Sequence, residues 1–398
     1  MTNELAPSVS RRDFGLLMWA TLVVFAILYT PQPLLPLLAR EFAVERSQAA
    51  LLMTLAMLPL AVAPLLYGHI VERWSARRVL HLTLLLMVGT QLPFLFSSDL
   101  HWILIGRFLQ GALLPAAFTA LMTWTSSLAT PERMRQVMGT YIAVTIVGGF
   151  SGRAVTGVLA DLVGWRAGFW FWTLALLLAW LGVQFIPKDP GTRFNKLPWS
   201  EIGTVWRQPT CRQAYLTTFI LFVGFSGILN ALPFRMKALE PEVSESVVAF
   251  VYLGYLMGSL IALNSERISV WTGSPRGNVL LGLTLFLAGV GLLLWPAISG
   301  AYAAMFVFCA GFFLTHSTLS GVVNLQARGN RGVVNGLYLT FYYAGGATGS
   351  YVPLLVYHHY GWLTFLALTS GCVGLALLLN RASASAELPQ PGVEVRRG

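Results

Sequence analysis

Residues 139–165 read GTYIAVTIVGGFSGRAVTGVLADLVGW, and residues 336–362 read GLYLTFYYAGGATGSYVPLLVYHHYGW. At an offset of 197 residues the two stretches share glycines, a tyrosine and a tryptophan without a gap. The pairs are Gly139 with Gly336, Tyr141 with Tyr338, Gly148 with Gly345, Gly149 with Gly346, Gly152 with Gly349, Gly164 with Gly361, and Trp165 with Trp362. So many matches at one offset indicate an internal repeat, and the chain is therefore expected to consist of two related halves.

The composition is that of a protein that crosses a lipid bilayer many times. Of the 398 residues, 56% are apolar and only 11% are charged, whereas a soluble globular chain carries about 25% charged residues. This excludes a soluble enzyme with a water-facing surface, and it excludes a disordered chain, which is poor in apolar residues. The apolar runs are continuous and long enough to cross, which favours transmembrane helices over the alternating pattern of a membrane barrel.

We expect an all-α polytopic membrane protein whose twelve transmembrane helices form two pseudo-symmetric bundles of six. The predicted spans are 14–38, 48–70, 79–97, 102–124, 136–159, 167–187, 214–234, 246–264, 278–297, 300–323, 333–356 and 363–380. The predicted domains are an N-terminal six-helix bundle over 1–187, a cytoplasmic linker over 188–213, a C-terminal six-helix bundle over 214–380, and a disordered cytoplasmic tail over 381–398.

The distribution of basic residues predicts how the chain crosses the membrane. The chain carries 26 Lys and Arg against 16 Asp and Glu, a net charge of +10, and basic residues gather in the cytoplasmic loops of membrane proteins. With the N-terminus inside, nineteen of them fall in cytoplasmic segments and five in outer loops. Both chain ends are therefore predicted to be cytoplasmic, and the charge indicates membrane orientation rather than a nucleic-acid partner.

Two short motifs carry a family resemblance. Residues 68–78 read GHIVERWSARR, which resembles the signature G-x-x-x-D-R-x-G-R-R of the major facilitator superfamily, with Glu72 for aspartate and Ser75 at the second glycine. In the fourth predicted span, Arg107, Gln110 and Gly111 resemble the R-x-x-Q-G element of the same superfamily. The resemblance implies the major facilitator fold, in which two six-helix bundles alternate access to a ligand site near the middle of the membrane.

The fifth predicted span resembles the antiporter glycine motif of the superfamily, but Arg153 stands where the family has proline. The glycines concerned in this span and in its repeat are Gly139, Gly148, Gly152, Gly157, Gly345 and Gly349. Small residues at helical spacing let two helices approach closely in lipid. The alternatives are static tight packing and a bending or sliding of the helices during transport.

Two further stretches narrow the resemblance to one branch. Residues 311–317, which read GFFLTHS, and the step Ser151-Gly152-Arg153 are similar to the YnfM-type drug and sugar efflux branch of the superfamily. That branch consists of drug:proton antiporters of the bacterial inner membrane. The resemblance therefore implies efflux, with protons as the coupled ion.

The resemblance also assigns a gate to the loop residues Gly68, Glu72, Arg73, Arg77 and Arg78. Glu72 can face the positive N-terminus of the eleventh helix, while the arginines find carboxylates or helix C-termini. The alternative is that the positive charge only keeps this loop on the cytoplasmic side. For Arg77 and Arg78 the two interpretations are equally supported.

Ionisable residues inside the predicted spans are candidates for function because charge within a bilayer is costly. Arg107 and Arg153 lie well inside, His316 lies in the tenth span and Asp161 near the outer end of the fifth, and no carboxylate lies near the centre of a span. Arg153 either faces a cavity and attracts an anion or pairs with neighbouring helices. His316 is a candidate proton relay because histidine titrates near neutral pH, or it is a hydrogen-bonded packing residue; Asp161 is the second titratable candidate.

Arg107 must find acceptors for its five N–H donors. Arg107 and Gln110 either take part in transport or are satisfied by backbone carbonyls of the outer half of the first span, which is rich in proline (Pro31, Pro33, Pro36).

Substrate contacts are expected from polar and aromatic side chains on the helices that line the ligand site. The candidates are Tyr29, Gln32, Tyr141, Asn230, Tyr252, Tyr255, Tyr338 and Tyr342. Aromatic walls with few fixed charges suit amphipathic organic molecules. The alternative for each tyrosine is a place in helix packing or at the membrane interface.

These observations favour a secondary transporter that exports a small organic molecule, a drug or a metabolite, by proton antiport. The sequence contains no G-x-x-x-x-G-K-[ST] loop, so ATP is not expected to drive it. The alternative is a facilitator or exchanger for an anionic metabolite, and an enzyme is remote because no metal motif or pair of deep carboxylates occurs. The three cysteines lack metal-binding spacing, and we expect no cofactor, no metal and a monomer.

Overall fold

The computed structural model describes residues 11–70, 74–130, 133–186, 200–326 and 331–382. Every regular element within these ranges is a helix, which confirms the predicted all-α class. The chain divides into two compact units. Unit 1 contains residues 1–197 and 240–252, and unit 2 contains residues 198–239 and 253–398. A segment of the second half of the sequence, residues 240–252, therefore belongs to the first unit.

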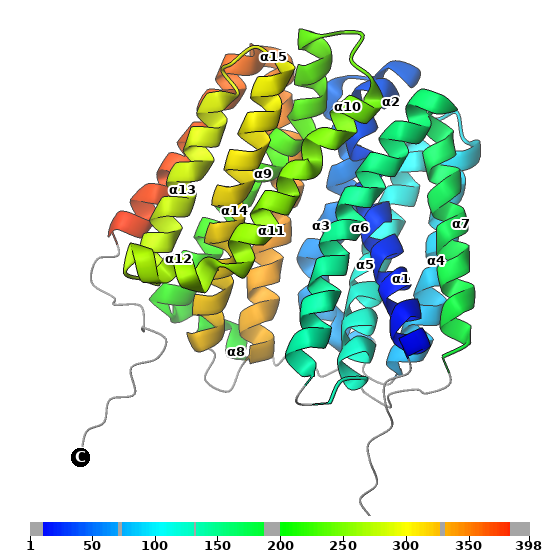
Figure 1. Ribbon diagram of the computed structural model, residues 1–398, viewed down its shortest axis with the longest axis horizontal. Helices are drawn as coiled ribbons and strands as arrows, with labels where there is room; N and C mark the ends of the chain where they lie inside the picture. Colours follow the sequence, from blue (N-terminus) through cyan, green and yellow to red (C-terminus); the bar gives the residue numbers. More distant parts are fainter. Residues whose placement is uncertain (1–10, 71–73, 131–132, 187–199, 327–330, 383–398) are drawn as a thin grey trace, which may run out of the picture. The chain divides into compact units, whose positions relative to one another are not determined.

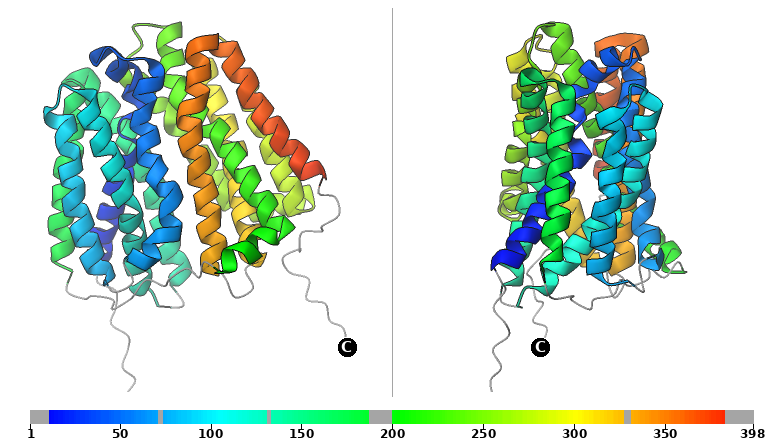
Figure 2. Two further views of the ribbon diagram at one scale, coloured as in Figure 1. Left: turned by 180° about the vertical axis from the view of Figure 1, so that it is seen from behind. Right: turned by 90° about the vertical axis from the view of Figure 1, so that its right-hand side faces the viewer.

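Unit 1 is built from two layers of long helices. In Figure 1, α1, α6 and α7 lie in front of α3, α4 and α5, and Figure 2 shows these three from behind. Helix α1 packs against α5, α6 and α7, while α5 also packs against α3 and α4. The elements are α1 (Arg11–Tyr29), η1 (Gln32–Leu34), α2 (Leu35–Glu41), α3 (Arg46–Ile70), α4 (Ala76–Phe96), α5 (Leu100–Ser127), α6 (Met134–Leu162), α7 (Trp165–Gln184) and α10 (Glu245–Phe250).

In unit 2, the long helix α9 runs along α15, and α14 packs against α11 and α13. The short turn η2 (Val251–Leu253) joins α10 of unit 1 to α11. The elements of unit 2 are α8 (Ser200–Arg207), α9 (Pro209–Leu239), α11 (Gly254–Leu263), α12 (Ser265–Thr272), α13 (Pro275–Leu292), α14 (Ile298–Gln326) and α15 (Arg331–Ala382).

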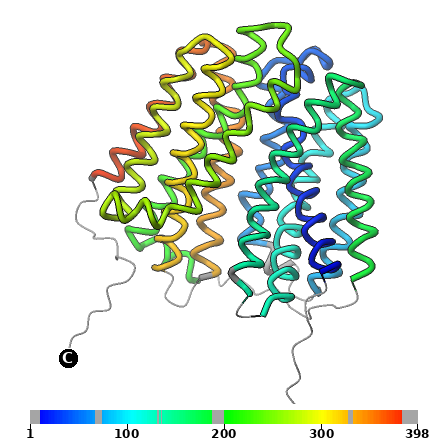
Figure 3. The backbone as a smooth tube through the Cα atoms, in the orientation of Figure 1, coloured from blue at the N-terminus to red at the C-terminus, as the bar shows by residue number. Residues whose placement is uncertain are grey.

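The number of membrane spans agrees with the sequence once α15 is counted as two. The described residues contain 11 helical stretches long and apolar enough to cross a membrane, and the last of them, Gly332–Arg381, is 50 residues long. Figure 3 shows that it doubles back as two antiparallel arms. The backbone turns at Gly361, where φ is 83°, a conformation that residues with a Cβ rarely adopt. Its repeat partner Gly164 also has a positive φ, 119°, between α6 and α7.

The internal repeat of the sequence is also a repeat of helix contacts. A Cβ added to any of four repeated glycines would overlap the backbone of a neighbouring helix. The contacts are Gly148 with Leu22, Gly152 with Ala26, Gly345 with Phe219, and Gly349 with Val223. The second two contacts follow from the first two by adding 197 to both residue numbers. The close approach of α1 to α6 is therefore reproduced by α9 and α15, and the repeat includes the first helix of each half.

Two predicted spans are interrupted, which corrects the continuous runs expected from hydropathy. The first span, predicted over 14–38, ends as an α-helix at Tyr29 and continues as η1 and α2. Pro31 and Pro33 lack the N–H that a continuing helix needs, so the break falls at these residues. The eighth span, predicted over 246–264, consists of α10, η2 and α11.

The predicted linker over 188–213 is partly helical. Residues 188–199 and the greater part of the predicted tail lie outside the described residues, but α8 occupies Ser200–Arg207 and α9 begins at Pro209. The seventh span therefore starts earlier than the predicted residue 214. Proline is well tolerated in the first turn of a helix because its missing N–H would have no partner there.

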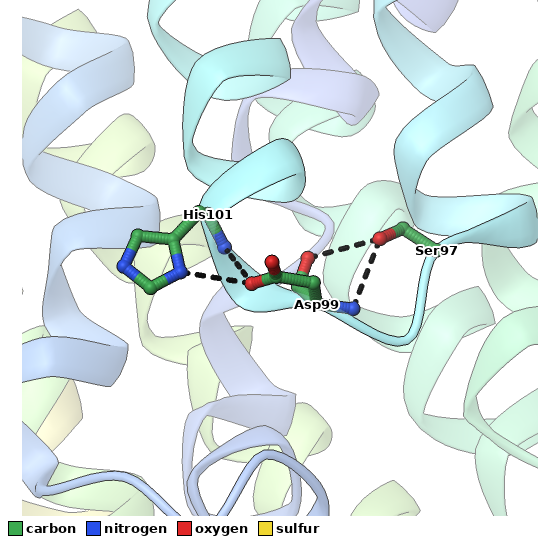
Figure 4. A network of polar contacts seen from close by, with 3 residues as sticks. All are labelled: Ser97, Asp99 and His101. Atoms are coloured by element: carbon green, nitrogen blue, oxygen red, sulfur yellow. Dashed lines mark hydrogen bonds and ion pairs between the residues drawn. The ribbon is translucent and has the colours of Figure 1, made fainter.

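The start of α5 is fixed by a small polar network (Figure 4). The Asp99 carboxylate accepts the backbone N–H of His101 at 2.9 Å and lies 2.8 Å from the Nδ1 atom of the same residue. The Ser97 hydroxyl donates to the Asp99 carbonyl and accepts the Asp99 N–H, both at 3.0 Å. The hydrogen bond from the His101 backbone lowers the pKa of Asp99, so this helix cap is charged at neutral pH.

Candidate functional site

Arg153 lies in α6 with only 1% of its surface exposed. Its Nε atom donates to the side-chain carbonyl of Gln32 at 2.7 Å, and Nη1 donates to the Gly149 backbone carbonyl at 2.8 Å. The guanidinium carbon lies 4.0 Å from the ring centroid of Tyr29 and 4.6 Å from that of Tyr252, within the range of cation–π attraction. We call these five residues the Arg153 cluster.

The break in the first span places two members of this cluster. Tyr29 is the last residue of α1 and Gln32 is the first residue of η1. Four candidates named separately from the sequence, Tyr29, Gln32, Arg153 and Tyr252, thus meet at one point of unit 1. These partners of Arg153 are neutral. They stabilise its guanidinium through hydrogen bonds to an amide oxygen and a backbone carbonyl and through cation–π contacts with two aromatic rings.

Unit 2 has a different arrangement at the repeat-related place. Adding 197 to Tyr29 and Arg153 gives Ser226 and Ser350, whose hydroxyl oxygens lie 2.8 Å apart. The Ser350 hydroxyl donates to the Gly346 carbonyl at 2.8 Å, just as Arg153 donates to Gly149. The same backbone framework therefore carries a charged cluster in one unit and a pair of small hydroxyls in the other.

Arg107, on α5, joins three helices of unit 1. Its Nε atom donates to the Leu52 carbonyl of α3 at 2.7 Å. Its two Nη atoms donate to the carbonyls of Ile27 and Leu28 on α1, at 3.3 and 2.8 Å, and Nη1 also donates to the side-chain oxygen of Gln110. The Gln110 amide nitrogen is one of the buried atoms of the described chain with no hydrogen-bond partner.

Two of the acceptors of Arg107, the carbonyls of Ile27 and Leu28, lie in the outer half of the first predicted span, just before its prolines, as one of the two sequence-based alternatives expected. In a helix the Ile27 carbonyl would accept the N–H of residue 31, and proline has none. Arg107 supplies the missing donor. The break at the prolines leaves carbonyls without a helical donor, and the buried guanidinium of Arg107 needs acceptors. Their hydrogen bonds meet both needs, and an unpaired carbonyl within a membrane would be costly.

Asp161, near the end of α6, binds the start of α10. Its two carboxylate oxygens accept the backbone N–H groups of Glu245 and Ser246, both at 2.8 Å. Asp161 therefore does not lie in the Arg153 cluster, as its eight-residue separation from Arg153 suggested. The first residues of a helix have N–H groups without intrahelical acceptors, and Asp161 supplies these acceptors from another helix.

His316 lies on α14 in unit 2, against Tyr338 of α15. The Tyr338 hydroxyl is 2.9 Å from His316 Nδ1 and 3.0 Å from the His316 carbonyl oxygen. The His316 ring centroid is 4.7 Å from that of Tyr342 and 5.8 Å from that of Phe312. His316, Tyr338 and Tyr342, which the sequence named separately, therefore form one group, which we call the His316 group.

Aromatic rings surround the His316 group. Tyr342 stacks on Phe222 with ring centroids 4.1 Å apart, and Phe312 stacks on Phe225 at 3.7 Å. Tyr255 of α11 makes an edge contact with Phe225. Asn230 is buried on α9. Unit 2 thus contains a packed aromatic region in which histidine and tyrosine are among the polar groups.

Comparison with known proteins identifies the family. Residues 17–350 match the family model described as Major Facilitator Superfamily, and this range covers most of the chain. The chain belongs to the major facilitator superfamily.

Individual proteins resemble the transporter along nearly its whole length. Inner membrane transport protein YnfM of Escherichia coli (strain K12) is 28% identical over 370 residues, which cover 91% of this chain and 88% of that protein. Tetracycline resistance protein, class B, of Escherichia coli is 25% identical over 381 residues, which cover 87% and 90%. The crystal structure of a mutant of the nucleoside transporter NupG aligns with a TM-score of 0.82 at 10% identity, covering 93% of this chain and 99% of that one. The expected superfamily and fold are therefore confirmed.

Of the predicted gate residues of the transporter, Glu72 and Arg73 lie outside the described residues. Gly68 belongs to the last turn of α3. Arg77 donates from Nη2 to the carbonyl of Gln184, the last residue of α7, at 3.3 Å. The backbone N–H of Arg78 donates to the Ser75 hydroxyl, which caps α4. Arg77 thus contacts a helix C-terminus, one of the two kinds of partner considered for it.

The glycines of the predicted antiporter motif of the transporter differ in their surroundings. Gly148 and Gly152 lie against the α1 backbone, and Gly157 lies against α10, where an added Cβ would come within 2.5 Å of the Ala249 Cβ. Gly139 has no neighbour within 4 Å of such a Cβ. Close packing therefore explains three of the four positions, and nothing in the structure explains Gly139.

Sequence reasoning missed the partners of Asp161, although a local signal exists. Ser244 precedes α10 and its hydroxyl accepts the Val247 N–H at 3.3 Å, the pattern of a helix-capping serine. That signal marks where the eighth span of the transporter starts.

Among the described residues, no group of three His, Cys, Asp or Glu could hold a metal ion.

Proposed function

We propose that the transporter is a secondary active exporter of a small organic molecule, driven by proton antiport across a bacterial inner membrane, with both chain ends in the cytoplasm. The efflux direction is supported by the similarity to a tetracycline resistance protein. The membrane is supported by the similarity to an inner membrane transport protein of Escherichia coli. The orientation is supported by the excess of basic residues in the loops assigned to the cytoplasm.

The observation that carries the proposal is the difference between the Arg153 cluster and its repeat-related counterpart. If the helix framework required a charged group at this place, unit 2 would need one as well. Instead, Ser226 and Ser350 fill the corresponding position with a hydrogen bond of 2.8 Å. A buried charge that the framework does not need is expensive to keep in a membrane, so we assign Arg153 to substrate recognition.

Protons are proposed as the coupled ion, with His316 as the carrier. The transporter reconstituted in liposomes should accumulate or expel substrate when a pH gradient is imposed. In His316→Gln, which keeps hydrogen-bonding capacity but cannot titrate, we expect gradient-driven transport to fall at least 10-fold while exchange of labelled for unlabelled substrate persists. A wild-type protein that ignores the gradient would contradict antiport and favour a facilitator.

A second candidate is a transporter of anionic metabolites, and the Arg153 cluster favours it. A guanidinium can form two parallel hydrogen bonds with a carboxylate or a phosphate. Among the partners of Arg153 are the amide oxygen of Gln32, the Gly149 carbonyl and two aromatic rings, none of which carries a net charge. The rings of Tyr29 and Tyr252 would contact an organic body attached to the anion.

The variant Arg153→Ser distinguishes these candidates, because serine is the residue that the repeat places at position 350. We expect Arg153→Ser to fold, since the unit 2 framework already accommodates serine, and to lose at least 10-fold in transport. Ligands are first found by the rise they cause in the melting temperature of the wild-type protein, and Ser350→Ala is the control. Loss confined to anionic ligands supports the anion transporter, loss for all ligands supports the broader exporter, and full activity contradicts a role in recognition.

A further inference from the structure

Helix α12 of unit 2 lies at one face of the membrane. It joins two candidate membrane spans, Glu245–Leu263 and Pro275–Leu292, and Figure 1 shows it running crosswise between α11 and α13. None of its eight residues is buried. Val270 and Trp271, near its end, are 79% and 85% exposed. This helix, too short to cross the membrane, therefore presents large apolar side chains outside the protein core.

The helix that precedes α12 has the same kind of surface. Leu260 and Leu263, in the last turn of α11, are also largely exposed. Tryptophan at the end of a membrane span is typical of the boundary between lipid headgroups and hydrocarbon. A helix that lies in this plane places its apolar side chains among the lipids. The lipid bilayer is therefore the partner whose chemistry fits Val270 and Trp271.

The same end of unit 2 carries a fixed guanidinium, that of Arg276 in the first turn of α13. Its Nε atom donates to the Asn380 carbonyl at 3.0 Å, and Nη2 donates to the Arg381 carbonyl at 2.6 Å. These two bonds use two of its five N–H donors, and Nη1 makes no hydrogen bond to any of the described residues. The end of α15 thus holds this guanidinium in place and leaves donors for an anion.

The charge around Arg276 is positive. Arg267 of α12 and Arg381 at the end of α15 are exposed, and Glu266 is the acidic residue in the first turn of α12. Three arginines against one glutamate leave a balance of +2. Basic clusters at a membrane face attract negatively charged headgroups, and a guanidinium can bind a phosphate group through two parallel hydrogen bonds.

We propose that α12 and the start of α13 form a binding site for an anionic phospholipid. The phosphate of the headgroup binds Arg276, and the acyl chains contact Val270 and Trp271. A phospholipid accounts for both features, whereas a soluble phosphate accounts only for the charge. The site lies in unit 2 and shares no residue with the Arg153 cluster or the His316 group, so the inference goes beyond the proposed transport function.

The first test measures which lipid the purified transporter retains. Native mass spectrometry of delipidated protein in neutral detergent should show at least 5-fold more bound phosphatidylglycerol than phosphatidylcholine. Arg276→Gln should remove this preference, because glutamine carries no charge, and Arg166→Gln should keep it. Arg166 is the matched control because it also donates to a backbone carbonyl, that of Ser97 at 2.9 Å, but Glu41 pairs with its guanidinium at 3.5 Å. An unchanged preference in Arg276→Gln would overturn the site.

The second test leaves Arg276 and its contacts with α15 intact. In a background whose three native cysteines are replaced by serine, Val270→Cys carries a nitroxide label in vesicles that contain phosphatidylglycerol. We expect this label to collide at least 3-fold more often with oxygen than with a water-soluble nickel complex. His101→Cys is the control for a water-facing position, because the His101 side chain is 88% exposed and bound to Asp99. A label at residue 270 as accessible to nickel as the one at residue 101 would place α12 in water and overturn the proposal.

Other occupants of this surface predict different results. If glycerol phosphate raises the melting temperature of the wild type as much as phosphatidylglycerol does, the ligand is a soluble phosphate and the lipid site is wrong. If the protein is a dimer that Trp271→Ala separates, the surface belongs to a second copy and the lipid site is again wrong. A transporter that binds phosphatidylglycerol through Arg276 but moves no substrate would contradict the proposed function and support this site.

Discussion

Gly152→Leu is expected to abolish the accumulation of folded transporter, whereas Gly139→Leu is expected to leave it unchanged. A Cβ at Gly152 would overlap the carbonyl and Cα atoms of Ala26, and a backbone cannot rotate aside as a flexible side chain can. Separating α1 from α6 would also disturb the neighbouring contact between Gly148 and Leu22. Forcing extra methylenes into a packed site costs about 1–3 kcal/mol and occasionally more, and a clash with backbone on two helices belongs at the upper end of this range, a large part of the stability of a folded protein.

The measurement is the yield of monodisperse protein after solubilisation, together with its melting temperature. Gly139→Leu makes the same chemical change on the same helix, where an added Cβ meets nothing within 4 Å. Gly349→Leu tests the repeat, because its overlap with Val223 is related to that of Gly152 with Ala26 by the offset of 197, and it should be as damaging. A Gly152→Leu protein as stable as the Gly139→Leu protein would rule out the close helix approach.

Arg107→Met should destabilise unit 1 by about 2–5 kcal/mol, because it leaves buried carbonyls without donors. Methionine preserves length and flexibility but cannot donate to Ile27, Leu28 or Leu52, which Arg107 holds at 2.7–3.3 Å. Of these carbonyls, that of Ile27 has no substitute within the helix since residue 31 is proline. For a protein of this size the melting temperature should fall by roughly 2–6 °C.

Arg77→Met is the matched control for this experiment. Arg77 also donates to a backbone carbonyl, that of Gln184 at 3.3 Å, but the contact is exposed, and water can take the place of the guanidinium. Its loss should cost no more than about 0.5 kcal/mol. Equal melting temperatures for the two variants would show that burial of the Arg107 acceptors does not matter, and would contradict the stabilising role assigned to Arg107.

The fold could be predicted because the features that determine it, long apolar runs and repeated glycines, recur throughout the sequence. Long apolar runs fix helices when no water is present to satisfy the backbone, and the repeated glycines at Gly148, Gly152, Gly345 and Gly349 mark where two pairs of helices touch. The breaks were not predicted, since hydropathy averages over them. Pro31 and Pro33 lie in an apolar run, and the turn at Val251–Leu253 contains no proline or glycine to announce it.

The residues of the candidate site could be predicted from their type, but the contacts between them could not. Residue type alone singled out Arg107, Arg153, His316 and the tyrosines, because polar groups are rare in these spans. Which of these residues contact one another depends on where the helices cross, and the pattern of one sequence does not show the crossing points. Tyr29 and Arg153 are 124 residues apart, and Asp161 and Glu245 are 84 apart.

The interruption after Tyr29 serves both buried arginines from one short length of backbone. Residues 27 and 28 present carbonyls to Arg107, and residues 29 and 32 present a ring and an amide to Arg153. Arg107 and Arg153, which lie on different helices, thus both contact one segment of six residues, 27–32. A substitution that makes this segment continuously helical, such as one that replaces Pro31, would change the surroundings of both charges at once. A change of backbone in the first span therefore cannot alter the environment of one arginine without altering that of the other.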